Sequence, residues 1–245
     1  MFFKGMKELS VSDHLDHLQQ QWQRKGVCLQ EEFFNNLKTL KLSCCEFEPY
    51  AIPSNVLSSF KNLTELEVAQ CDKITGIFEM NDTEMKETSF QLKKLTLKLL
   101  SNATHVWQPK KQGIIRFKNL QTMTVLDCKD LSTLFPIALA RDLKKLEELH
   151  VESCDALPNI VKADKAGTFD EQLVFPCLTR LILSCLTNLT DFCSHDFILE
   201  FTELSCLNVS NCNKQLELFQ SQREENQNST SATEIFVKRK QCLFQ

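Results

Sequence analysis

Apolar residues recur along this chain in one short pattern. The pattern reads leucine, two residues, leucine, one residue, leucine, two residues and then a cysteine or a leucine, and Met123 replaces the second leucine of its copy. The steps between successive first leucines are 26, 29, 28, 26, 32 and 26 residues, and these leucines are Leu37, Leu63, Leu92, Leu120, Leu146, Leu178 and Leu204. Repetition at this interval is typical of a solenoid, in which similar units stack side by side.

The leucine-x-leucine part of each unit alternates apolar and polar residues, as in a strand with one buried face. A single unit buries too few apolar side chains to offset the conformational entropy that folding removes. Parallel strands stacked about 4.8 Å apart bury one another's apolar faces and pair their backbones. We therefore predict one strand per unit, at residues 40–42, 66–68, 95–97, 123–125, 149–151, 181–183 and 207–209.

The remainder of each unit predicts the opposite side of the stack. Apolar pairs such as Ile77 with Phe78 suit an irregular turn or a single helical turn, and residues 52–60 and 135–143, with prolines near their starts, suit short outer helices. The predicted fold is an α/β solenoid with a curved parallel sheet on its concave face and short helices and turns on its convex face. Phenylalanines before the first leucines should form an internal spine: Phe60, Phe90, Phe117, Phe175 and Phe201.

The cysteines point to structure rather than to reactivity. Cysteine or leucine fills the last position of the pattern, which we call the corner, so this position should be buried and apolar. Neighbouring corner thiols, Cys45 with Cys71 and Cys128 with Cys154, should approach the separation that a disulfide needs, and a reducing compartment would keep them open. The corner residues are Cys45, Cys71, Leu100, Cys128, Cys154, Leu186 and Cys212.

Composition argues against most enzymes and against nucleic-acid binding. Five glycines are too sparse for a phosphate loop or a dinucleotide fingerprint, and a net charge of −4 with scattered basic residues gives no positive stripe. The pair His14 and His17 lacks a second pair of metal ligands, and Cys185 or Cys193 with His195 lacks an orienting group and an oxyanion hole. We expect no enzymatic activity, no cofactor and no metal.

Two features bear on location. The first ten residues contain no apolar run of signal-peptide length, which favours a cytoplasmic protein. Against this, six glycosylation sequons begin at Asn62, Asn81, Asn102, Asn188, Asn208 and Asn228, so a secreted, glycosylated repeat receptor remains the alternative. The ending Cys242-Leu243-Phe244-Gln245 loosely fits a prenylation box, although we expect no membrane association.

Several units share a distinctive sequence motif. Examples are Phe60-Lys61-Asn62-Leu63-Thr64-Glu65-Leu66-Glu67-Val68 and Lys144-Lys145-Leu146-Glu147-Glu148-Leu149-His150-Val151-Glu152-Ser153-Cys154-Asp155. Over residues 33–219 the chain resembles the leucine-rich repeats of plant intracellular immune receptors of the coiled-coil, nucleotide-binding class. The resemblance implies a protein-recognition module in the defence response. Its partners would be a pathogen effector, a guarded host protein or the receptor's own nucleotide-binding domain, which the repeats hold inactive.

The resemblance also bears on domain organisation. We predict a degenerate N-terminal repeat over residues 1–32, an array of about seven units over 33–219, and a polar, disordered linker or tail over 220–245. The nucleotide-binding and coiled-coil domains of such receptors are missing from this sequence, so we interpret it as a fragment. A repeat-bearing ubiquitin-ligase adaptor is a further alternative, but thirty leading residues are too short for an F-box-like segment.

The partner-binding surface is predicted from the polar positions of the strands, which face away from the core. Three lysines make one unit basic and three glutamates make another acidic two units later, so the concave face should be electrically banded, which favours orientation and association rate. Apolar residues on such a face favour contact with a partner. The predicted site is Lys41, Glu67, Lys93, Lys94, Thr96, Lys98, Leu99, Thr124, Leu126, Glu147, Glu148, His150, Glu152, Arg180, Ile182 and Asn208.

Overall fold

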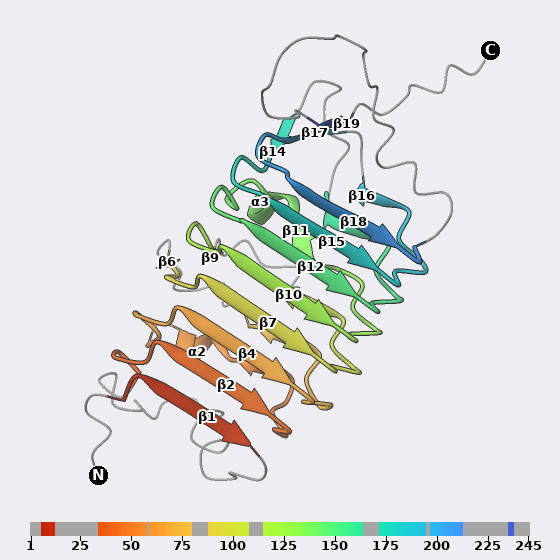
Figure 1. The fold of residues 1–245 in the computed structure, drawn as a ribbon. Coiled ribbons are helices and arrows are strands. Elements are labelled where there is room, and N and C mark those ends of the chain that lie inside the picture. Colours follow the sequence, from red (N-terminus) through yellow and green to blue (C-terminus); the bar gives the residue numbers. More distant parts are fainter. Residues whose placement is uncertain are drawn as a thin grey trace, which may run out of the picture.

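Eight parallel strands form the main sheet of the protein, one from each successive turn of the chain (Figure 1). A computed structural model describes residues 6–12, 34–57, 59–79, 88–107, 115–163, 172–194, 197–212 and 235–237. The order of the strands in the sheet follows their order in the sequence, so each unit stacks on the unit that precedes it in the chain. The strands are β1 (Glu8–Ser12), β2 (Thr39–Ser43), β4 (Glu65–Ala69), β7 (Lys94–Lys98), β10 (Thr122–Leu126), β12 (Glu148–Glu152), β15 (Arg180–Ser184) and β18 (Cys206–Ser210).

The register of these strands aligns the repeated leucines. Leu66 pairs with Leu95, Leu95 pairs with Met123, and Met123 pairs with Leu149. These side chains face the interior and are at most 1% exposed, because each is covered by its equivalents in the two neighbouring units. The seven predicted strands are all present, and Leu120 is fully buried between units, which confirms the repeat and its register.

The opposite wall is built from short strands, where we predicted irregular or helical turns. Apolar pairs after the corner lie in extended backbone and pair with the next unit, as Phe78 does with Trp107. Pairing in this way satisfies the backbone of each turn while burying both members of the apolar pair, such as Ile77 and Phe78. Two small sheets result, β3 (Tyr50–Ile52), β5 (Gly76–Phe78) and β8 (His105–Trp107), and then β11 (Phe135–Pro136), β13 (Asn159–Lys162) and β16 (Asp191–Cys193).

Helix is scarce in the described residues. The two predicted outer helices shrink to single turns, α2 (Ser54–Leu57) and α3 (Ile137–Ala140), because the residues before Pro53 and at Pro136 belong to strands of the second wall. The Glu79 carboxylate of the next unit accepts bonds from the Ser54 backbone N–H and hydroxyl at 3.0 and 3.1 Å. The remaining strands are β6 (Thr88–Ser89), β9 (Ile115–Arg116), β14 (Gln172–Val174), β17 (Ile198–Phe201) and β19 (Ile235–Val237), the last antiparallel to β17.

Aromatic rings fill the interior, but the predicted spine is divided into clusters. Phe90 and Phe117 stack with centroids 5.5 Å apart, and Phe175 and Phe201 stack at 5.7 Å. Between these clusters, Leu143 takes the place of a phenylalanine and is fully buried. Trp107 joins the first cluster and donates its indole N–H to the Leu134 carbonyl at 2.6 Å. The rings therefore tie neighbouring units together in groups.

Every strand of the main sheet from β2 onward is followed by one residue in the left-handed backbone region. Where another strand of the sheet follows, the N–H of this residue donates to the carbonyl at the end of that strand, for example from Gln70 to Lys98 at 3.0 Å. This bend turns the chain from the sheet into the corner, where the cysteine and leucine side chains are buried as predicted, apart from a partly exposed Cys212. The left-handed residues are Cys44, Gln70, Leu99, Asp127, Ser153, Cys185 and Asn211.

Candidate functional site

The outward side of the eight-stranded sheet, which we call the concave face, carries three rows of side chains. Because the strands pair in register, the central outward residue of each strand lies directly beside that of the next. This row contains seven of the residues that we predicted as partner contacts: Lys41, Glu67, Thr96, Thr124, His150, Ile182 and Asn208. The strands that carry this row, β2 to β18, lie side by side across the sheet in Figure 1.

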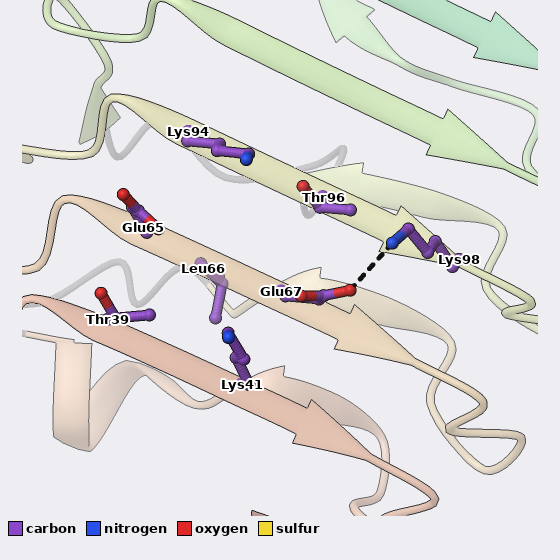
Figure 2. Close-up of a pocket in the computed structure, with 8 residues that line it drawn as sticks. All are labelled: Thr39, Lys41, Glu65, Leu66, Glu67, Lys94, Thr96 and Lys98. Atoms are coloured by element: carbon purple, nitrogen blue, oxygen red, sulfur yellow. Dashed lines mark hydrogen bonds and ion pairs between the residues drawn. The ribbon is translucent and has the colours of Figure 1, made fainter. Parts of the chain in front are cut away.

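A shallow hollow of about 170 Å³ opens on the concave face over β2, β4 and β7 (Figure 2). Its floor includes the otherwise buried Leu66. Lys98 donates to Glu67 at 3.0 Å, and Lys41 lies 3.3 Å from Glu8. The other lining residues are Thr39, Glu65, Lys94 and Thr96.

Lys94 also lines this hollow, and its ammonium group has no carboxylate partner among the described residues. None of the ion pairs formed within the described residues involves it. Thr96, a predicted contact, is only 6% exposed, because it sits in the middle of the sheet beside the Lys98–Glu67 ion pair. Thr96 therefore shapes the hollow and offers little surface of its own.

The acidic band lies on β12, with β10 between it and the basic band on β7, as predicted. Its carboxylates are engaged by contacts that the pattern did not reveal, one of them an ion pair. The Glu152 carboxylate lies 3.0 Å from His150 Nε2, and Glu148 lies 3.6 Å from Arg180 on β15. Glu147, in the turn before β12, accepts a bond from the Gln121 side chain at 2.8 Å. The basic and acidic bands are therefore both present, but they carry fewer unpaired charges than three lysines and three glutamates without partners would.

The strand between the bands is neutral. Thr122, Thr124 and Leu126 are its outward residues, and all three are partly exposed. Leu99 follows β7 at the same end of the sheet as Leu126 and is 47% exposed. Among the other predicted contacts, Lys93 and Asn208 are exposed and Ile182 is partly buried.

Sequence reasoning missed Thr39 and Glu65, which line the hollow. Both occupy the first outward position of their strands, two residues before the chosen Lys41 and Glu67. The period of two would have marked them, because residues i and i+2 of a strand share a face. The pattern could not show the hollow itself, because the hollow depends on the side-chain conformations of neighbouring residues.

The corner thiols are free in the structure. Cys71 and Cys154 are fully buried, and each thiol donates to the carbonyl two residues before it, at 3.3 and 3.4 Å. Within the pair Cys128 and Cys154, the hydrogen bond between the thiols and burial raise the pKa of Cys154, so this thiol stays protonated and unreactive.

Three of the glycosylation sequons coincide with structural positions of the repeat. The amide of Asn62 donates to the Asn35 carbonyl at 2.5 Å, and that of Asn102 donates to the Asp72 carbonyl at 2.6 Å. The hydroxyls of Thr64, Thr104 and Thr190, the third residues of these sequons, bond to carbonyls of the preceding unit. The repeat geometry thus explains the recurrence of this tripeptide without glycosylation; Asn81 and Asn228 lie outside the described residues.

The described residues contain no cluster of three or more histidine, cysteine or acidic side chains that could hold a metal ion. His14, His17 and His195, and the ending Cys242 to Gln245, lie outside the described residues. Within the described part of the chain, no helix is long and apolar enough to cross a lipid bilayer.

Comparison with known proteins agrees with the stacked strands. The family model for plant disease resistance protein RPS2-like leucine-rich repeats matches residues 5–155, which is more than half of the chain. No curated protein matches the sequence significantly. The leucine-rich-repeat fold is a scaffold for protein interaction and not typically catalytic. The chain belongs to the family of plant disease resistance protein RPS2-like leucine-rich repeats.

Proposed function

We propose that the concave face is the recognition surface of an intracellular plant immune receptor, acting in the cytoplasm. The supporting observation is the contrast within each strand. Inward positions repeat the same apolar residues, whereas the aligned outward row changes from lysine to glutamate, threonine, histidine, isoleucine and asparagine. Packing between similar units accounts for the inward residues, and the outward diversity suits contact with one particular partner.

The proposed partners are a pathogen effector, a guarded host protein or the nucleotide-binding domain of the same receptor class. The basic and acidic bands of the concave face are compatible with each of these partners, because separated opposite charges on a protein surface steer and orient an incoming protein. We also propose that the repeats act within a longer receptor. Reading the genomic sequence around this frame tests this point, and a nucleotide-binding domain upstream in the same frame is the expected result.

A charge-reversal experiment tests the recognition surface. The probe is the nucleotide-binding domain of an RPS2-like receptor, followed by effectors from a two-hybrid library. The test variant carries Lys93→Glu, Lys94→Glu and Lys98→Glu. The matched control carries Lys61→Glu, Lys129→Glu and Lys162→Glu, three exposed lysines outside the eight-stranded sheet.

We expect the concave variant to lose at least about tenfold in affinity, which corresponds to about 1.4 kcal/mol, while the control binds normally. Circular dichroism should show both variants folded, because exposed charges contribute little to stability. Equal losses in both variants, or no loss in the concave one, would assign recognition to another surface.

A further inference from the structure

Leu99 combines two unfavourable properties. It is 47% exposed, and its φ of 53° places a leucine in the left-handed region, which disfavours residues with a branched or bulky side chain. The equivalent residues of four other units are polar: Gln70, Asp127, Ser153 and Asn211. A leucine at this bend adds surface that water solvates poorly, so packing within the chain does not explain it.

Leu126 is the neighbour of Leu99 at the end of the next strand, β10. The Leu99 N–H donates to the Leu126 carbonyl at 2.9 Å, and the Leu126 side chain lies on the partly exposed outward side of β10. Lys98, which pairs in register with Leu126, directs its ammonium group toward Glu67 instead. We call Leu99 and Leu126 the apolar step; it lies at the edge of the concave face where β7 and β10 end.

Lys94 lies at the other end of β7 from the apolar step, on the rim of the hollow. Figure 2 shows Lys94 at the upper rim of the hollow, at the start of β7, and Lys41 two strands away on β2. Lys98 and Lys41 already have carboxylate partners, whereas Lys94 has none within the described residues. Lys98, which pairs in register with Leu126, is four positions after Lys94, so at about 3.3 Å per residue Lys94 and the apolar step are about 13 Å apart along the strand.

We propose that one extended segment of a partner protein lies along β7, with a carboxylate side chain beside Lys94 and a large apolar side chain against Leu99 and Leu126. This inference rests on the proposed function of the concave face. In an extended chain, residues at even spacing share a face and four residues span about 13 Å. The partner motif is therefore an aspartate or glutamate and a leucine-like residue four positions apart.

Random dodecamers displayed on phage are the probe. They are selected on the wild-type chain, without prior depletion on any variant. Enriched peptides are then synthesised, and their affinities are measured by fluorescence anisotropy. The single variants are Lys94→Glu and Leu99→Asn, with Lys129→Glu and Gln70→Asn as matched controls. Gln70→Asn places the same residue at the same bend of the preceding unit.

We expect enriched peptides to share the acidic and apolar pair at spacing four. Each single variant should weaken binding at least about tenfold, and both controls should bind as wild type. The thermal midpoint of Leu99→Asn should stay within about 2 °C of wild type, because relief of the left-handed backbone offsets the loss of a half-exposed leucine.

A library without enriched peptides, or peptides lacking this pair, would overturn the inference. So would a Leu99→Asn variant that melts well below wild type, since the leucine would then serve the fold. Peptides that ignore Lys94→Glu and Leu99→Asn but are lost on Arg180→Glu would overturn the inference while supporting the concave face as the binding surface. Peptides insensitive to all three variants would count against both proposals.

Discussion

The two sides of the main sheet differ sharply although they are made by the same strands. On β10, Val125 faces the interior and is fully buried, while its neighbour Thr124 faces outward and is partly exposed. Inward residues are restricted to a few apolar types because each must fit between two copies of itself. Outward residues carry no such restriction. The difference locates stability on one side of the sheet and leaves the other free for recognition.

The largest expected effect comes from reversing polarity on the inward side. Val125→Asp places a carboxylate among apolar side chains in the centre of the stack and should cost more than about 4 kcal/mol of unfolding free energy. Thr124→Asp, one residue away, should cost less than about 1 kcal/mol. Urea denaturation of both variants measures the contrast, and similar losses would mean that the two sides do not differ as described.

The same contrast explains how much of the fold could be predicted from the sequence. Inward leucines repeat because the stack repeats, so their spacing revealed the strands, the parallel order and the buried corner. The second wall was predicted less well. Ile77 and Phe78 are adjacent and both buried, so their spacing does not distinguish a turn from a strand that is paired with neighbours on both sides. These segments are strands because their backbones pair with those of the neighbouring units, and such pairing produces no periodic pattern in the sequence of the second wall.

The candidate site was predictable only in outline. The period of two identified the outward residues, but not which of them cancel one another. Whether Lys98 binds Glu67 or Lys94 binds Glu65 depends on side-chain direction across strands, and the structure shows the first of these. Leu99 was predicted as an outward contact, but the cause of its exposure is the left-handed bend after β7, which no residue type in its unit signals.

The second wall contains a row of three paired residues, in which Gly76 is buried and Tyr50 and His105 are partly exposed. Gly76 lies between Tyr50 and His105, and a Cβ atom there would meet His105 Nε2 at 2.6 Å and Tyr50 Cε1 at 2.7 Å. Gly76→Ala should therefore lower the free energy of unfolding by about 1–3 kcal/mol. In the double variant Gly76→Ala with His105→Ala, part of that loss should be recovered. An unchanged urea midpoint for the single variant would show that the two rings move aside freely.

His105 should make this row sensitive to acid. Burial lowers the pKa of His105, whose ordinary value is near 6.5, and its Nε2 is buried without a hydrogen-bond partner. The Thr104 hydroxyl lies 3.3 Å from the Thr75 carbonyl and 2.9 Å from His105 Nδ1. When this hydroxyl donates to the carbonyl, the neutral ring donates from Nδ1 and Nε2 carries no proton. Protonation would place an N–H at Nε2 against Gly76 and Tyr50.

Because the folded state binds this proton less readily than the unfolded chain, the contribution of His105 to stability is complete above about pH 6.5. It declines as the pH falls from there toward the lowered pKa. Urea midpoints at pH 7.5, 6.5 and 5.5 should fall more steeply for the wild type than for His105→Gln. Parallel curves for the two proteins would indicate that His105 titrates as an exposed histidine does.

The smallest expected effect lies on the outward side, in the ion pair between Lys98 and Glu67. Their side chains are 39% and 34% exposed, so water screens the attraction. A double-mutant cycle of Lys98→Gln and Glu67→Gln should yield a coupling below about 1 kcal/mol, measured by urea denaturation. Binding should respond more strongly, because Lys98→Gln releases the Glu67 carboxylate into the hollow beside Lys94. A coupling above about 2 kcal/mol would instead make this pair part of the fold, and the concave face would then share in the stability that we assign to the interior.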